Sequence, residues 1–278
     1  MKGAWRLRQL MRKAGRFGFR IRIVWPHCRR ALGNAVRWLV RSREDTNLTY
    51  DLTERNISHL AAFVANVMGG SPAEAAAHIR ELREDRELAD HVRRLTEEAD
   101  MTDSADPVVR YGRRLGWYAI VRRRKPRVVV ETGVDKGLGS CVISAALRRN
   151  AAEGRPGRLY ALDIDPKAGW LLRPPYSEHG TLLVGDALDS LKNLKETVDL
   201  FISDSDHSAE YEAREYRAVE ALLAEDALVI SDNAHCTDAL VEFARETGRR
   251  FLYFQEVPTD HWYPGAGIGI AFLKGGEG

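Results

Sequence analysis

The sequence is poor in cysteine, and its three cysteines stand far apart without a C-x-x-C pair among them: Cys28, Cys141 and Cys236. We therefore expect neither a disulfide framework nor a zinc knuckle. The sequence also lacks any apolar run near the roughly 18 to 20 residues of a spanning helix, and its N-terminus lacks a secretory signal. These absences favour a cytoplasmic protein that is neither secreted nor membrane-spanning.

Acidic residues are absent from the first 43 positions, which hold 13 of the 42 lysines and arginines. The remaining chain therefore has 29 basic residues against 40 acidic ones, and this acidic body argues against a nucleic-acid partner. We interpret residues 1–45 as a basic amphipathic arm.

Apolar residues of this arm, Leu7 and Leu10 among them, recur every three or four positions with arginines between them. The pattern predicts an amphipathic helix that Pro26 interrupts, and a second helical piece over 31–40. We expect residues 1–43 to contact the inner face of a membrane peripherally, although a solvated arm or one packed on its own body fits equally well.

Residues 46–106 have a helical pattern throughout. Thr53 predicts a helix that begins after it and ends at Gly69-Gly70, and Ser71-Pro72-Ala73-Glu74 is a capping box with proline at the first helical position. We expect a small helical cap. A lid over a pocket is the favoured role, and structural packing is the alternative.

Strand-like and helical runs alternate from residue 107 to 278. Helical stretches separate the first five strands, which predicts a parallel sheet, whereas only a loop separates the last two, which should pair antiparallel. The predicted fold is α/β, with a doubly wound, mostly parallel, seven-stranded, Rossmann-like sheet. The expected strands span 127–131, 158–163, 180–184, 199–204, 227–231, 250–257 and 268–273.

A glycine-rich turn follows the first strand. Glu131, Gly133, Gly137 and Gly139 have the spacing E-x-G-x-x-x-G-x-G, and Ser140 lies in the apolar helix that follows. Glycines let the backbone approach a ligand closely, and the helix presents free N–H groups. The spacing differs from the G-x-G-x-x-G that cradles a pyrophosphate, so we expect a ligand without one.

Aspartates end the next two strands, at Asp163 and Asp186. A carboxylate after the second strand can accept hydrogen bonds from both ribose hydroxyls of a nucleoside, and one after the third is placed to receive an adenine amino group. Either aspartate alone could be a helix cap. Acids in register at successive strand ends favour the ligand-binding interpretation.

With these three features in order, residues 107–278 resemble a class I S-adenosylmethionine-dependent methyltransferase. The resemblance implies that Glu131 and Gly133 lie beside the methionine moiety of S-adenosylmethionine, Asp163 on the ribose and Asp186 near the adenine. It also implies that Gly137, Ser140 and Asp204 belong to the cofactor site. Residues 46–106 lie outside the resemblance.

Two further strands end in side chains with oxygen atoms, Asp204 after the fourth and Asp232-Asn233 after the fifth. Oxygen ligands from adjacent strand ends suit a hard divalent cation such as Mg²⁺. These three residues resemble the metal site of catechol O-methyltransferase-like enzymes. The run 204–208, Asp-Ser-Asp-His-Ser, also resembles the cephalosporin hydroxylase and rhamnosyl O-methyltransferase group.

His207 stands where the catechol enzymes have a lysine base, so it is our candidate general base for an acceptor hydroxyl. The alternative is a helix N-terminal residue that orders Asp206. His235 and His261 are weaker candidates. The aromatic loop 259–264 is a candidate wall of the acceptor pocket, as is Trp117-Tyr118, which helix packing explains almost as well.

These features predict a metal-dependent O-methyltransferase that acts on a sugar, a lipid-linked acceptor or a polyhydroxylated natural product, in natural product or polysaccharide biosynthesis. Three alternatives remain. They are a phenolic acceptor, an S-adenosylmethionine-binding scaffold without transferase activity, and a nicotinamide-dependent oxidoreductase. Whether the chain forms a homo-oligomer is left open.

Overall fold

A computed structural model describes residues 2–43, 49–99 and 108–273, without the side chains of residues 2–5 and 7–10. The predicted boundaries between arm, cap and catalytic domain, at 45/46 and 106/107, lie outside these ranges, as do the side chains of Leu7 and Leu10.

The core of the molecule is a seven-stranded sheet with the order β3-β2-β1-β4-β5-β7-β6. The first five strands are parallel, and β7 lies antiparallel between β5 and β6. This arrangement confirms the predicted doubly wound sheet and its antiparallel end. The strands are β1 Val128–Thr132, β2 Arg158–Asp163, β3 Gly180–Val184, β4 Val198–Ser203, β5 Leu223–Ser231, β6 Arg250–Gln255 and β7 Gly267–Phe272.

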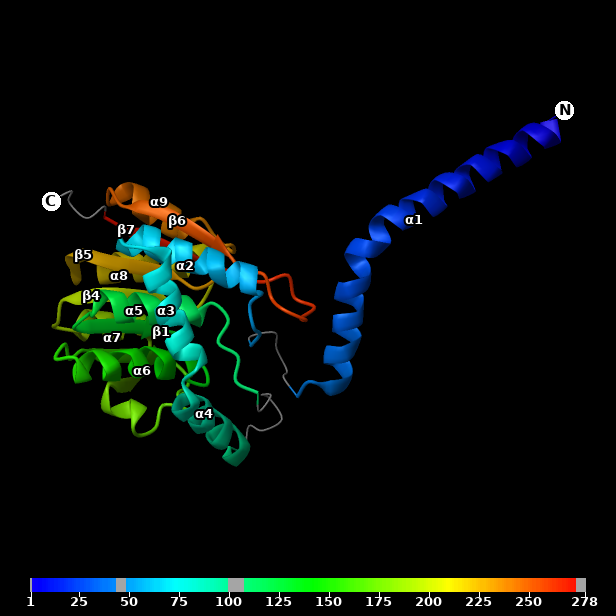
Figure 1. Ribbon diagram of the computed structural model, residues 1–278. Coiled ribbons are helices and arrows are strands. Elements are labelled where there is room, and N and C mark those ends of the chain that lie inside the picture. The colour runs from blue at the N-terminus through cyan, green and yellow to red at the C-terminus, as the bar shows by residue number, and fades with distance from the viewer. Residues whose placement is uncertain (1, 44–48, 100–107, 274–278) are drawn as a thin grey trace.

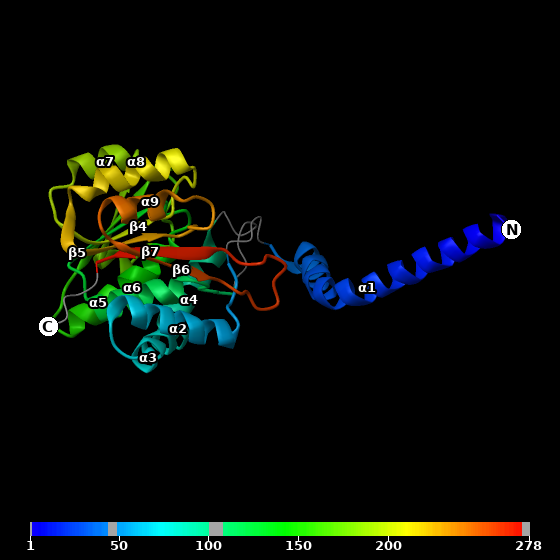
Figure 2. The same ribbon diagram turned by 90° about the horizontal axis from the view of Figure 1, so that it is seen from above.

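Helices cover both faces of the sheet (Figure 2). Because both faces are covered, β1 and β7 are buried along their whole length, including the polar residues Glu131 and Thr132 at the end of β1. One face carries α5 (Arg114–Arg124) and α6 (Leu138–Ala152). The other carries α7 (Ala187–Asn193), α8 (Ala209–Glu220) and α9 (Ala239–Glu246). A short 3₁₀ turn, η2 (Tyr176–Glu178), precedes β3.

Three further helices form a layer outside α5 and α6: α2 (Glu54–Met68), α3 (Pro72–Arg83) and α4 (Arg86–Glu98). Their predicted caps are confirmed. The Thr53 side chain accepts a hydrogen bond from the Asn56 N–H, and Ser71 and Glu74 form the reciprocal capping box. Leu60, Ile79, Leu82 and Leu88 are buried in the same apolar core as the central sheet. These helices are therefore packed as a structural layer of the domain.

The N-terminal arm is one helix, α1 (Lys2–Arg41), that runs through Pro26. The expected break into two pieces is wrong. Proline removes one backbone hydrogen bond and bends a helix, and the long amphipathic segments on either side continue past it. Figure 1 shows α1 extending away from the body and changing direction part-way along. None of the helices in the described ranges is apolar enough over a sufficient length to cross a membrane.

Candidate active site

A cavity of about 860 Å³ opens at the carboxyl ends of the five parallel strands. Six of the residues predicted from the sequence line it: Gly133, Asp163, Asp186, Asp204, His207 and Asn233. Four others, Glu131, Gly137, Ser140 and Asp232, lie behind its wall. The topology thus gathers residues from five separate strand ends, as expected for a parallel sheet.

Gly133 brings two strand ends together at the floor of this cavity. Its φ of +79° is left-handed, and a Cβ there would overlap the carbonyl oxygen of Asp204. The peptide N–H of Gly133 donates to the Leu162 carbonyl of β2 at 2.9 Å, and the Asp204 N–H donates to the Thr132 carbonyl at 2.8 Å. Only glycine meets both requirements, so the loop after β1 can lie directly against the loop after β4.

Asp163 holds the glycine-rich loop in position. Its Oδ2 accepts hydrogen bonds from the N–H groups of Val134 at 2.7 Å and Asp135 at 3.0 Å, and its Oδ1 accepts one from Asp165 at 2.8 Å. A carboxylate offers about four acceptor positions. Asp163 therefore organises the loop and retains acceptor capacity that faces the cavity.

Asp186 is both a helix cap and a residue that lines the cavity, the two roles that the sequence left open. It is the N-cap of α7, with its Oδ1 accepting from the Leu188 N–H at 2.8 Å, and it also lines the cavity. A cap uses one oxygen of the carboxylate, so the residue can stabilise α7 and still accept a hydrogen bond from a ligand.

Glu131 is buried behind the glycine-rich loop at 1 % exposure. Burial raises the pKa of its carboxyl to about 7, although the Ser140 hydroxyl donates to it at 2.5 Å. Gly139 makes room for this carboxyl, because a Cβ there would overlap it. Glu131 and Ser140 therefore support the loop from behind instead of lining the cavity.

Arg113, at the N-cap of α5, occupies the position beside Asp232 where the sequence predicts a metal ion. Its Nε donates to Asp232 Oδ1 at 2.5 Å and its Nη2 donates to Asp232 Oδ2, and both side chains are buried. A bidentate guanidinium engages both oxygens of the carboxylate. No group of three or more His, Cys, Asp and Glu side chains in the described ranges could hold a metal ion. In this arrangement Asp232 is held by Arg113 and would have to release the guanidinium before it could bind a divalent cation.

The protonation of the two strand-end aspartates follows from this pairing. Burial and then the neighbouring charge of Asp232 raise the pKa of Asp204 well above its ordinary value. Burial also acts to raise the pKa of Asp232, but the charge and hydrogen bonds of Arg113 outweigh it and lower that pKa. Asp232 is therefore the more acidic of the two, and Asp204 is the one whose protonated form is favoured, although Arg114 Nη2 lies 3.8 Å from its Oδ2.

A buried polar network extends behind Arg113. Glu256 accepts hydrogen bonds from the Arg113 N–H at 2.8 Å and from the Tyr50 hydroxyl at 2.6 Å. Sequence reasoning missed Arg113, Tyr50 and Glu256, because each lies outside the strand-end motifs. The only available signal was an arginine pair at 113–114 just before an otherwise apolar helical stretch.

His207 lines the cavity, with a hydrogen bond at one ring nitrogen and a carboxylate facing the other. The Asn233 amide nitrogen donates to Nε2 at 2.7 Å, so the ring proton lies on Nδ1. Nδ1 faces the buried Glu212 carboxylate with 3.6 Å between Nδ1 and Oε1, and Asp204 Oδ1 lies 3.7 Å from Nε2. Glu212 was not predicted, since a single glutamate at the start of a helix carries no such signal.

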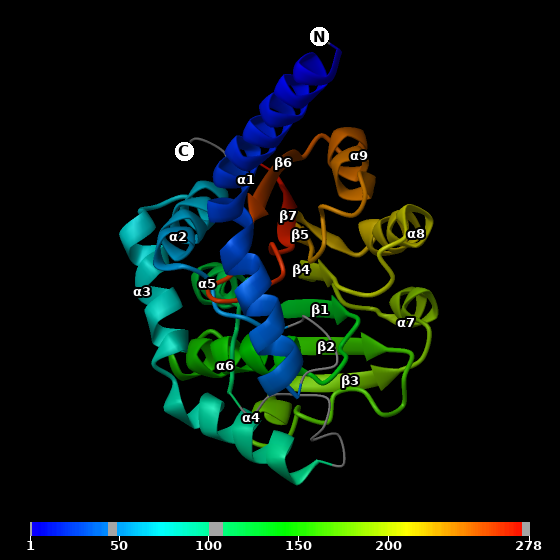
Figure 3. The ribbon, with the colours of Figure 1, turned by 90° about the vertical axis from the view of Figure 1, so that its right-hand side faces the viewer.

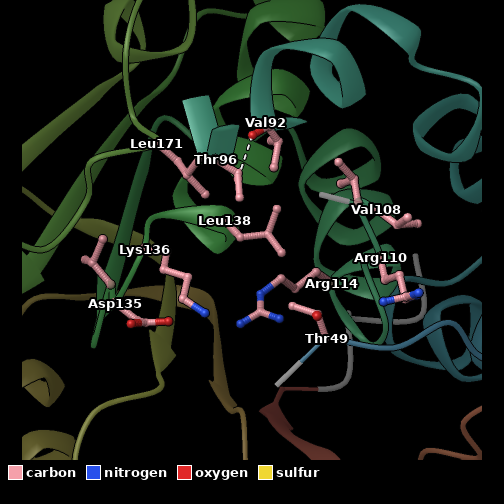
Figure 4. A pocket seen from close by; sticks show the side chains of 12 residues that line it. Thr49, Val92, Thr96, Val108, Arg110, Arg114, Asp135, Lys136, Leu138 and Leu171 are labelled. Atoms are coloured by element: carbon pink, nitrogen blue, oxygen red, sulfur yellow. Dashed lines mark hydrogen bonds between the residues drawn. The ribbon is translucent and has the colours of Figure 1, made fainter. Parts of the chain in front are cut away.

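A smaller cavity of about 50 Å³ adjoins the first one (Figure 4). The two share Arg114, Asp135 and Lys136, and α4 contributes Val92 and Thr96 to the smaller one. Of the three helices in this layer, α4 lines the smaller cavity, whereas α2 and α3 line neither; the lid role stays a prediction, and α4 is the helix placed for it.

The aromatic residues predicted to form walls of the acceptor pocket do not line the large cavity. Trp117 and Tyr118 are fully buried in the core, so helix packing accounts for them. In the loop 258–266, the rings of His261 and Tyr263 contact Tyr50, and Trp262 contacts Trp38 of α1 at 5.5 Å between ring centroids. Neither this loop nor His235 lines the large cavity.

Comparisons with known proteins agree with this fold. Residues 130–234 match a family model described as a methyltransferase domain. The O-methyltransferase TomG from Streptomyces achromogenes, which is involved in tomaymycin synthesis and was solved with S-adenosylmethionine, is 20 % identical. The match covers 69 % of this chain and 91 % of TomG, with a TM-score of 0.50.

A methyltransferase from Geobacter sulfurreducens is 18 % identical over 69 % of this chain and 92 % of its own length, also with a TM-score of 0.50. No curated protein sequence matches the chain. The predicted class I methyltransferase resemblance and its fold are confirmed by the family match and the strand order.

Proposed function

We propose that this chain, which contains a methyltransferase domain of the class I fold, transfers a methyl group from S-adenosylmethionine to a hydroxyl oxygen. The observation that carries the proposal is the cavity itself. The glycine-rich loop, Asp163 and Asp186 line it from three successive strand ends, in the order in which a nucleoside-containing ligand would meet them.

The lining of the cavity fits S-adenosylmethionine. Asp163 has acceptor capacity for ribose hydroxyls, and Asp186 has it for an amino group of the base. The cavity lining also includes Ile164, Trp170 and Ala187, whose apolar surface suits a purine ring. Gly133 leaves the backbone open beside them.

His207 is the proposed general base. S-adenosylmethionine supplies an electrophilic methyl group on a positively charged sulfur. The acceptor hydroxyl takes the place of the Asn233 amide at His207 Nε2. Nε2 then takes the proton of this hydroxyl as the oxygen–methyl bond forms and the methyl–sulfur bond breaks, which leaves neutral S-adenosylhomocysteine. The resulting imidazolium keeps its Nδ1 proton towards the Glu212 carboxylate, which stabilises the positive charge.

The predicted acceptor, a sugar or another polyhydroxylated molecule, stays a proposal. It is supported by the polar side chains next to His207 in the cavity, namely Ser205, Asp206, Tyr211 and Asn233. A hydroxyl-rich ligand can exchange hydrogen bonds with such a surface, whereas a phenol would need more apolar wall. We also propose a cytoplasmic location, which the three free cysteines favour.

The sequence also predicts that the transfer depends on a metal ion. The bidentate contact of Arg113 with Asp232 argues against this dependence. We propose that the positive charge beside these aspartates is the guanidinium, so that transfer proceeds without a divalent cation.

Titration calorimetry with S-adenosylmethionine and a methylation screen on the full chain test this proposal. The screen covers saccharide and phenolic acceptors, with Mg²⁺ and with EDTA. We expect S-adenosylmethionine to bind and a saccharide to be methylated equally with and without EDTA. Absence of S-adenosylmethionine binding would overturn the function. Activity on phenols alone would overturn the acceptor class, and activity that EDTA abolishes would overturn the role of Arg113.

A further inference from the structure

Helix α1 presents an apolar stripe that its own body does not cover. The stripe consists of apolar residues that fall within an arc of about 140° on one side of the helix, at 100° per residue. Each is between 47 % and 73 % exposed. The apolar stripe comprises Met11, Phe17, Ile21, Val24, Trp25, Leu32, Val36 and Leu39.

The contact between α1 and the body uses a different side of the helix. Arg30 pairs with Asp260 at 3.0 Å, and the Asn34 Nδ2 donates to the His261 carbonyl at 3.1 Å. Trp38 packs against Trp262. Arg30, Asn34 and Trp38 are four residues apart, so they form one line along the helix, and this line lies roughly opposite the apolar stripe. Docking on the body therefore turns the stripe outward.

The charge of α1 identifies what could cover the stripe. Residues 1–43 hold 13 lysines and arginines and no acidic residue. At 100° per residue, Lys13 and Arg22 lie next to the two edges of the stripe, and Arg29 lies at one edge itself. Helices that lie in the headgroup region of anionic bilayers combine large exposed apolar side chains with many cationic ones, as α1 does. Pairing of two such helices would instead bring like charges together.

Helix α1 lies on the same side of the protein as the opening of the large cavity. The loop 258–266, on which α1 docks, joins β6 to β7 at the end where β5 finishes, since Ser231 pairs with Gly269. This is the carboxyl edge of the sheet, where the catalytic cavity opens. Figures 1 and 3 show α1 leaving the body on that side.

We propose that α1 binds the surface of an anionic lipid bilayer, with the apolar stripe inserted among the headgroups and the flanking cations on anionic lipids. Binding in this way holds the cavity edge of the protein near the membrane. The proposal does not depend on the methyltransferase activity.

Co-sedimentation of the full chain with vesicles tests it. We expect binding to mixed phosphatidylglycerol and phosphatidylcholine vesicles, little binding to phosphatidylcholine alone, and release at high salt. Ile21→Gln removes an apolar side chain from the stripe and should weaken binding about tenfold. Ile23→Gln is the matched control, because Ile23 is similarly exposed at 52 % but lies on the other side of α1.

Three results would overturn the proposal. Equal effects of Ile21→Gln and Ile23→Gln would show that the stripe is not inserted. Equal binding to both kinds of vesicle would show that charge does not select the surface. A dimer in light scattering that Ile21→Gln dissociates, without vesicle binding by the original chain, would assign the stripe to a second copy of the chain.

Discussion

Replacing Arg113 by methionine should lower the free energy of unfolding by about 3–5 kcal/mol near pH 8. Arg113 and Asp232 are 5 % and 0 % exposed, and the guanidinium holds both carboxylate oxygens. Methionine keeps most of the side-chain length, so the loss arises chiefly from leaving the charge of Asp232 buried without its partner. Glu256 and Tyr50 would lose the same cation and add to the effect.

Urea unfolding followed by circular dichroism measures this loss. Arg124→Met provides the control, because Arg124 pairs with Asp226 at the surface, where the carboxylate is 68 % exposed. Exposed pairs contribute about 0–1 kcal/mol, so this variant should unfold nearly as the original chain does. The double variant Arg113→Met/Asp232→Asn should recover part of the stability, because the uncompensated charge is then absent.

The penalty should also depend on pH. Without Arg113, burial raises the pKa of Asp232, and the folded variant then binds a proton that the unfolded chain releases. Its stability should therefore fall as the pH rises, so the loss caused by Arg113→Met should be smaller near pH 5 than near pH 8. A loss near pH 8 no larger than that of Arg124→Met would refute the reasoning, since Asp232 would then not depend on Arg113 for its charge.

Three further outcomes are expected. His207→Ala should lower turnover by roughly 10² to 10⁴ and leave S-adenosylmethionine binding unchanged in calorimetry; unchanged turnover would return His207 to an ordering role. Asp163→Ala should weaken S-adenosylmethionine binding by about 1.5–3 kcal/mol, and an unchanged dissociation constant would leave Asp163 as a loop anchor only. Burial raises the pKa of Glu131 from 4.5 to about 7, so the original chain should lose stability between those pH values as the acid ionises. Glu131→Gln should flatten this slope by on the order of 3 kcal/mol, and parallel urea-unfolding profiles for the two proteins would contradict the assignment.

The strands could be predicted closely where buried apolar runs end in glycine or aspartate. The predicted bounds of β2 and β3 match the structure exactly, because Asp163 and Gly185 mark where each run stops. β5 begins four residues earlier than predicted, at Leu223, which pairs with Val198 across a register shift. Its exposed Glu225 and Asp226 hide this first half in the sequence, because they break the apolar run.

The sequence could predict those site residues that directly follow a strand, but not the residues that reach the site from elsewhere in the chain. The sequence placed two aspartates at adjacent strand ends and so indicated a positive charge between them. It did not indicate the source, because Arg113 lies 119 positions from Asp232 and before the first strand. The two sources differ in their protonation requirements. A divalent cation would need both aspartates ionised, whereas the bidentate contact of Arg113 lowers the pKa of Asp232, and the pKa of Asp204 stays raised even with Arg114 3.8 Å away. The protonation state of Asp204 therefore distinguishes the arginine-based site in the structure from the metal site that the motif predicts.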